Sequence, residues 1–104
     1  MAFVMRSNDL FLGNPFNIAG ASLLLAIVAD LTGYTPRFVN WIGLDCHIYL
    51  NHFNQVKELL KRKPKKFPSF KILTSRKNPE DYKIEDFEVL DYEPHPKISG
   101  DVAV

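Results

Sequence analysis

The sequence predicts an α/β domain of the layered α+β type, in which a mixed β-sheet packs on one buried apolar helix and a second, amphipathic helix. Three observations predict this fold class. A long apolar stretch centred on Ala19–Ala29 lies between short segments rich in aromatic and β-branched residues. A helical period follows from Asn51, and further strand-like segments come after it. Strands that alternate with two helices give a layered arrangement.

The length and composition fit one small domain. The 104 residues are expected to form a single domain, residues 1–104, with 46% hydrophobic residues and a formal net charge of +1. Such a charge gives no global field for nucleic acid or a membrane surface, so neither partner is expected. The longest apolar run ends at Asp30, short of the ~20 residues that a membrane-spanning helix needs. The single cysteine, Cys46, excludes an internal disulfide and suits a cytoplasmic protein.

The first half of the chain predicts a strand and the apolar helix. Ala2 to Met5 are apolar and favour a short strand. Pro15 suits the first turn of a helix, which we expect from about Phe16 to Leu31 and which Thr32-Gly33 should end. Apolar residues cover every face of this helix, so it belongs in the middle of a protein. A chain of this length has little material to cover it, which indicates that part of the protein is missing.

The second half predicts four strands and the amphipathic helix. Aromatic and β-branched residues favour strands at 36–42 and 46–50. The helix follows from Asn51, because apolar side chains recur at helical spacing until Pro64. Alternating apolar residues favour a half-buried strand around 70–72, and a last strand is expected over 87–92.

Two polar groups near the N-terminus are candidates for binding a nucleotide. Arg6 and Ser7 place a planar fork of donors beside a hydroxyl, a combination that suits a phosphate. The alternative is a solvated arginine beside a turn serine. Asn17, at the start of the apolar helix, carries both a donor and an acceptor, which an adjacent N–H and C=O on a pyrimidine edge would pair fully. The alternative there is a helix cap.

A second candidate group lies on the strand that follows Asp45. His47 and Tyr49 should share one side of that strand, where two polar rings could hold a hydroxyl. The alternative is a buried histidine with a half-exposed tyrosine. Cys46 should point to the opposite side, out of easy reach of His47, so we expect a small buried thiol rather than a nucleophile. The three histidines lack the spacing of a metal triad, and no metal site is expected. The basic cluster at 61–66 favours a solvated helix end over a nucleic-acid patch.

Several stretches together resemble one enzyme family. Arg6–Ile18 resembles the thymidylate synthase pattern R-S-x-D-x-x-L-G-x-P-F-N, which is long and specific. Asp45–His52 is similar to the family's G-D-A-H-I-Y-L-N-H, and Tyr92–Pro96 and the terminal Ala103-Val104 also match. The resemblance covers essentially the whole chain but only the last third of a typical family member. It implies a partial thymidylate synthase fold, a C-terminal fragment of that domain.

The resemblance also implies ligands and residue roles. The family reductively methylates dUMP to dTMP with 5,10-methylenetetrahydrofolate as co-substrate, after a cysteine thiolate attacks the base. Arg6 and Ser7 would hold the dUMP phosphate, Asn17 the uracil edge, and His47 and Tyr49 the deoxyribose 3′-hydroxyl. The residues expected at the folate are Asp9, Gly13, Phe16, Ala103 and Val104. Asp9 is also expected to contact the substrate.

The match departs from the family at the nucleophile. The family's cysteine lies in a P-C-H segment upstream of the position of Arg6, so no catalytic residue is expected in this chain, and Cys46 stands where the family commonly has Ala. We therefore expect weak dUMP binding and no catalysis by the chain alone. The expected partners are the missing N-terminal half and a second subunit, because the family is homodimeric. Two alternatives remain: a fragment of a phage-type dUMP or dCMP hydroxymethylase, or a non-catalytic remnant. Asn17, where cytosine-acting members tend to have Asp, favours uracil.

Overall fold

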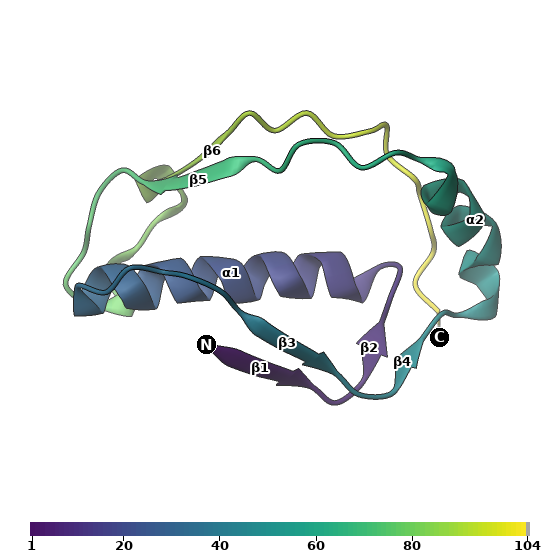
Figure 1. Ribbon diagram of the computed structural model, residues 1–104, viewed down its shortest axis with the longest axis horizontal. Coiled ribbons are helices and arrows are strands. Elements are labelled where there is room, and N and C mark those ends of the chain that lie inside the picture. The colour runs from purple at the N-terminus through teal and green to yellow at the C-terminus, as the bar shows by residue number, and fades with distance from the viewer. Residues whose placement is uncertain (104) are drawn as a thin grey trace.

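The computed structural model describes residues 1–103 and confirms the α/β class (Figure 1). The strands are β1 (Ala2–Met5), β2 (Asn8–Asp9), β3 (Asn40–Gly43), β4 (Cys46–His47), β5 (Ser69–Ile72) and β6 (Phe87–Leu90). The α-helices are α1 (Gly13–Thr32) and α2 (Phe53–Lys61). Three short 3-10 helices complete the fold: η1 (Leu50–His52), η2 (Pro79–Asp81) and η3 (Ile84–Asp86).

The strands form three separate two-stranded ladders instead of the single mixed sheet that the sequence predicted. β1 pairs with β3 and β2 pairs with β4, both in parallel, while β5 and β6 form an antiparallel hairpin. The direction of pairing is therefore mixed, but no strand links one ladder to the next within residues 1–103. The β2–β4 ladder joins the two sequence stretches that contain most of the predicted site residues.

Helix α1 is longer and much less covered than the sequence predicted. It begins at Gly13, before the expected Phe16, and ends as predicted at Gly33, whose φ of 71° is in the left-handed region. Only Ala21 and Ala29 are buried, so the expectation of a buried helix is wrong for this chain. In Figure 1, α1 runs between the β5–β6 hairpin and the β1–β3 ladder, and its Leu24 and Val28 remain 45% and 44% exposed. Its length and apolar composition would suffice to cross a membrane, a test that the core helix of a soluble protein also passes.

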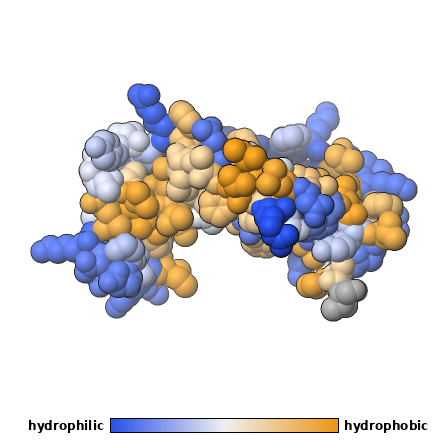
Figure 2. Space-filling model, turned by 90° about the horizontal axis from the view of Figure 1, so that it is seen from below, coloured by the Kyte–Doolittle hydropathy of each residue, from blue (hydrophilic) through white to orange (hydrophobic). Residues whose placement is uncertain are grey.

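The chain is expanded for its length. Its radius of gyration is 15.9 Å, whereas a compact domain of about 100 residues has roughly 13 Å. Its accessible surface is 8304 Å², against roughly 6,000 Å² for a compact protein of this mass. The buried hydrophobic residues in the described part are Phe11, Ala21 and Ala29. Figure 2 accordingly shows hydrophobic side chains gathered in exposed patches along the molecule. Much apolar surface that a compact domain buries is open here.

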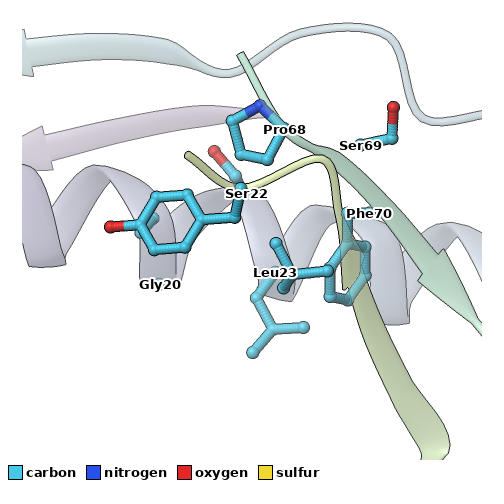
Figure 3. Close-up of a pocket in the computed structure, with 9 residues that line it drawn as sticks. Gly20, Ser22, Leu23, Pro68, Ser69 and Phe70 are labelled. Carbon is cyan, nitrogen blue, oxygen red and sulfur yellow. The ribbon is translucent and has the colours of Figure 1, made fainter. Parts of the chain in front are cut away.

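A cleft of about 580 Å³ separates α1 from the β5–β6 hairpin (Figure 3). Leu23 of α1 and Phe70 of β5 face it, together with Gly20, Pro68 and two serines. Among residues 1–103, the side chains that line this cleft are uncharged, and none of them is a predicted site residue.

Two polar clusters fix the loop between β5 and β6. The buried carboxylate of Asp86 accepts hydrogen bonds from Arg76 Nε at 2.9 Å, Arg76 Nη2 at 2.5 Å and the Lys83 N–H at 2.9 Å. The Arg76 guanidinium, and then the Lys83 N–H, hold the pKa of Asp86 below its usual range. At the end of α1, Asp30 accepts a hydrogen bond from the Tyr82 hydroxyl, which raises the pKa of Tyr82. The Asp86 contacts brace the loop internally, and the Asp30 contact ties it to α1.

Candidate functional site

The β2–β4 ladder brings the two predicted site stretches together. Asp9 lies directly opposite His47 in the register, and the Leu10 N–H donates to the His47 carbonyl at 2.9 Å. One residue before Asp9, the Asn8 N–H donates to the Asp45 carbonyl at 3.2 Å. Two residues predicted from separate motifs are therefore neighbours in space.

Asp9 also fixes the start of α1. Its Oδ1 accepts hydrogen bonds from the Phe11 N–H at 3.0 Å and the Leu12 N–H at 3.4 Å, just before the first helical residue. That first residue is Gly13, and a Cβ there would lie 3.5 Å from Asp9 Cβ and 3.4 Å from Asn17 Nδ2. Asp9 and Asn17 thus border the space that Gly13 leaves open. Three predicted residues form one polar corner at the N-terminal end of α1.

His47 and Tyr49 lie together, as the sequence predicted. Their ring centroids are 4.9 Å apart and the ring planes are nearly perpendicular, at 80°. His47 Nδ1 lies 2.8 Å from the Asp45 carbonyl oxygen. Because a carbonyl oxygen only accepts, Nδ1 is the donor, and in the neutral form of the ring Nε2 is left as an acceptor. This pair can accept a hydrogen bond from a ligand hydroxyl at His47 while the phenol of Tyr49 offers a second polar group beside it.

Arg6, Ser7 and Phe16 are exposed. Arg6 and Ser7 lie in the loop between β1 and β2, and Phe16, in the first turn of α1, is 79% exposed. No side-chain interaction within residues 1–103 joins them to Asn17 or to the ring pair. The structure therefore brings the acid, amide and ring groups together and leaves the predicted phosphate ligands open to solvent.

Cys46 is exposed, so the prediction of a buried thiol is wrong. Its Sγ lies 3.5 Å from Asn8 Nδ2, and a Cβ on Gly43 would come within 2.7 Å of it. No further strand in the described residues covers this side of the short β2–β4 ladder, which leaves the thiol accessible. The buried polar group at this position is Asn8, only 2% exposed, whose Oδ1 has no hydrogen-bond partner within residues 1–103. Nor do those residues contain a group of three or more His, Cys, Asp or Glu that could hold a metal.

His52, which was not among the predicted site residues, is fully buried. Its Nε2 lies 2.7 Å from the carbonyl oxygen of Asp101, so the C-terminal segment returns to the predicted site. The sequence pattern could have predicted this burial. Val56 and Leu59 form the apolar stripe of α2, and position 52 continues that stripe at helical spacing. Of the two C-terminal residues predicted at the folate, Ala103 is half-buried, and Val104 lies outside the described residues.

Comparison with known proteins gives a consistent result. The family profile described as thymidylate synthase matches residues 1–104. A thymidylate synthase from Mycoplasma mobile is 54% identical over 100 residues, covering 95% of this chain and 34% of that protein. Thymidylate synthases from Malacoplasma penetrans and Rhizobium rhizogenes are 52% and 50% identical, covering 95% of this chain and 34% and 32% of their own lengths. The chain thus spans about a third of the length of these relatives.

Proposed function

The chain belongs to the thymidylate synthase family, and from this premise we propose that it carries the nucleotide- and folate-binding part of a site that reductively methylates dUMP to dTMP. One observation carries the proposal. The polar corner of Asp9, Gly13 and Asn17 adjoins the His47–Tyr49 ring pair through the β2–β4 ladder. An amide, a carboxylate and two polar rings in this arrangement suit a pyrimidine nucleoside.

Each group has a role that its chemistry supports. The Asn17 amide donates to uracil O4 and accepts from N3–H, so both of its polar ends are paired. His47 Nε2 accepts from the deoxyribose 3′-hydroxyl, with the Tyr49 phenol beside it. Arg6 and Ser7 bind the phosphate, and their exposure leaves them free to turn toward it.

The co-substrate 5,10-methylenetetrahydrofolate supplies the one-carbon unit and the reducing equivalents when it is bound. Asp9 and Gly13 face its pterin, and Phe16 offers an exposed aromatic ring close by. Ala103 and Val104 close over the bound pair. The attacking thiolate comes from family sequence outside these 104 residues, because Cys46 lies on the strand beside His47 and its sulfur is directed at Asn8.

The expected partners follow from the open surface. The accessible area exceeds that of a compact protein by roughly 2,300 Å², which is in the size range of obligate interfaces. We propose that the remainder of the family sequence, in the same polypeptide or another, covers α1, and that a second subunit completes the dimer. The chain alone binds dUMP weakly and catalyses nothing, and the assembled protein is cytoplasmic.

Nucleotide titrations monitored by NMR test this proposal at Asn17. The wild-type chain should prefer dUMP to dCMP, and Asn17→Asp should reverse that preference by about ten- to a hundredfold, because an unpaired polar group costs about 1–3 kcal/mol. Asn54→Asp, the same change at an exposed position on α2, should leave the preference unaltered. Equal binding of both nucleotides by wild type, or no binding of either at millimolar concentration, would contradict the assignment.

A complementation assay tests the whole activity. A separately produced N-terminal portion of a family member, mixed with this chain, should form dTMP from dUMP and methylenetetrahydrofolate. The same mixture made with Arg6→Ala should lose most of that activity and should recover part of it at high dUMP. Formation of a hydroxymethyl product would instead assign the hydroxymethylase reaction.

A further inference from the structure

We infer that His52 is a positioning residue that holds the C-terminal segment, residues 100–103, beside the nucleotide-binding rings. The inference rests on the proposed function for the identity of the nucleotide, and on the described contacts for everything else. His52 lies in η1, directly after the predicted sugar-binding strand, and is fully buried. No part of the proposed chemistry uses it.

A shared carbonyl oxygen anchors the segment. His52 Nε2 lies 2.7 Å from the Asp101 carbonyl oxygen, and Asn51 Nδ2 donates to the same oxygen at 3.2 Å. The carbonyl only accepts, so the histidine proton sits on Nε2. His52 Nδ1 is then buried without a hydrogen-bond partner in the described chain. An apolar side chain would fill this position without that cost, so the bond to Asp101 is what the imidazole specifically provides.

The packing around the anchor leaves no room for a side chain at position 100. A Cβ on Gly100 would lie 2.7 Å from Phe11 Cε1 and 3.3 Å from both Cδ2 and Nε2 of His52. The backbone of Gly100 is outside the left-handed region, since Gly33 is the glycine with positive φ among residues 1–103. The constraint at Gly100 is therefore steric rather than conformational. The segment fits against Phe11 and His52 because position 100 has no side chain.

A row of ring contacts connects this anchor to the proposed nucleotide site. The Phe11 and His52 centroids are 5.0 Å apart, His52 and Tyr49 are 6.0 Å apart at 90°, and Tyr49 contacts His47 at 4.9 Å. Any shift of Tyr49 toward a bound sugar changes the packing of His52 and hence the Asp101 bond. Nucleotide binding and ordering of the segment should therefore favour each other, and by the same factor in both directions.

Backbone ¹⁵N relaxation of the full chain tests the anchor without any ligand. His52→Leu removes the donor but keeps an apolar side chain, and it also eliminates the unpaired Nδ1. The order parameters of residues 100–103 should fall from about 0.8 to below about 0.6, while those of the β5–β6 hairpin stay unchanged. His52→Gln, which retains an N–H donor, should restore part of the order. Gly100→Ala should release the segment while His52 is intact.

Two results would overturn the inference. One is unchanged order in residues 100–103 of His52→Leu. The other is equal loosening of the segment and the hairpin, with no rescue by His52→Gln, which describes an ordinary core residue.

A dUMP titration then tests the coupling. In wild type, dUMP should raise the order of the segment, and His52→Leu should bind dUMP about three- to tenfold more weakly, as the loss of one hydrogen bond predicts. If dUMP binds both proteins equally, the coupling is wrong although the nucleotide assignment stands. If dUMP perturbs no resonance of wild type, the proposed function fails, and the ligand-free comparison still decides the role of His52.

Discussion

Truncation of Phe11 should remove a large share of the stability of this chain. Phe11 is 9% exposed and lies against His52 and Gly100. Burying an aromatic side chain removes about 150–250 Å² from water, which at about 25 cal/mol/Å² gives about 4–6 kcal/mol. Measured Phe→Ala changes in cores cost about 3–5 kcal/mol. Phe11→Ala should therefore lower the free energy of unfolding by about that amount, out of the roughly 5–15 kcal/mol typical of a whole domain.

Urea unfolding followed by far-ultraviolet circular dichroism measures this loss, and Phe67 supplies the matched control. Phe67 is 89% exposed, so Phe67→Ala should change the free energy of unfolding by less than about 0.5 kcal/mol. Phe11→Leu keeps most of the apolar volume and should cost about 1 kcal/mol, which stays measurable if the alanine variant is unfolded. Equal costs for Phe11→Ala and Phe67→Ala would refute the reasoning, because they would show that Phe11 is not buried in solution.

Three further predictions concern backbone conformation, acid stability and thiol access. Gly33→Ala should destabilise the chain by about 1 kcal/mol, because φ there is 71°. Gly20→Ala should stabilise α1 by about 1 kcal/mol, since nothing lies within 4 Å of the added Cβ. The two substitutions should therefore shift the urea midpoint in opposite directions, and shifts in the same direction would contradict the described course of α1. The lowered pKa of Asp86 means that its contribution is complete above the unfolded value of about 3.9 and is lost as the pH falls through the folded value. Asp86→Asn should lower the urea midpoint at neutral pH and flatten its fall in acid, and an unchanged acid profile would show that the Arg76 contact does not stabilise the fold. Cys46 should react with a thiol reagent in the folded chain nearly as fast as in urea; strong protection in the folded state would contradict its exposure.

The elements set by local sequence were predicted, and those set by partners were not. The end of α1 was predicted because Gly33 can adopt the left-handed conformation that stops a helix. The expected strand over 36–42 begins only at Asn40, because Pro36 has no N–H and the partner strand β1 offers four residues. The strand expected over 46–50 ends at His47, because the Tyr49 carbonyl instead accepts the His52 N–H in η1.

The same division holds for the site. Asn17, His47 and Tyr49 were predicted from side-chain chemistry and from a long motif. The adjacency of Asp9 and His47 depends on strand register, which no local spacing contains. Exposure was the property predicted least well: α1 and Cys46 were both expected inside, and both are open. Apolar patterning indicates that a helix needs a cover, but it does not say which residues provide that cover.

The division of the strands into separate ladders affects the solubility and the cellular abundance of this polypeptide. Within residues 1–103, β1 pairs with no strand other than β3, and their Phe3 and Trp41 rings stack at 5.1 Å across the pair. Each outer margin of that ribbon presents a row of amide and carbonyl groups on which a foreign strand can grow. When the chain is overexpressed, we expect irreversible aggregation to compete with folding to the soluble state. Chaperones and proteases, rather than equilibrium unfolding, would then set its abundance.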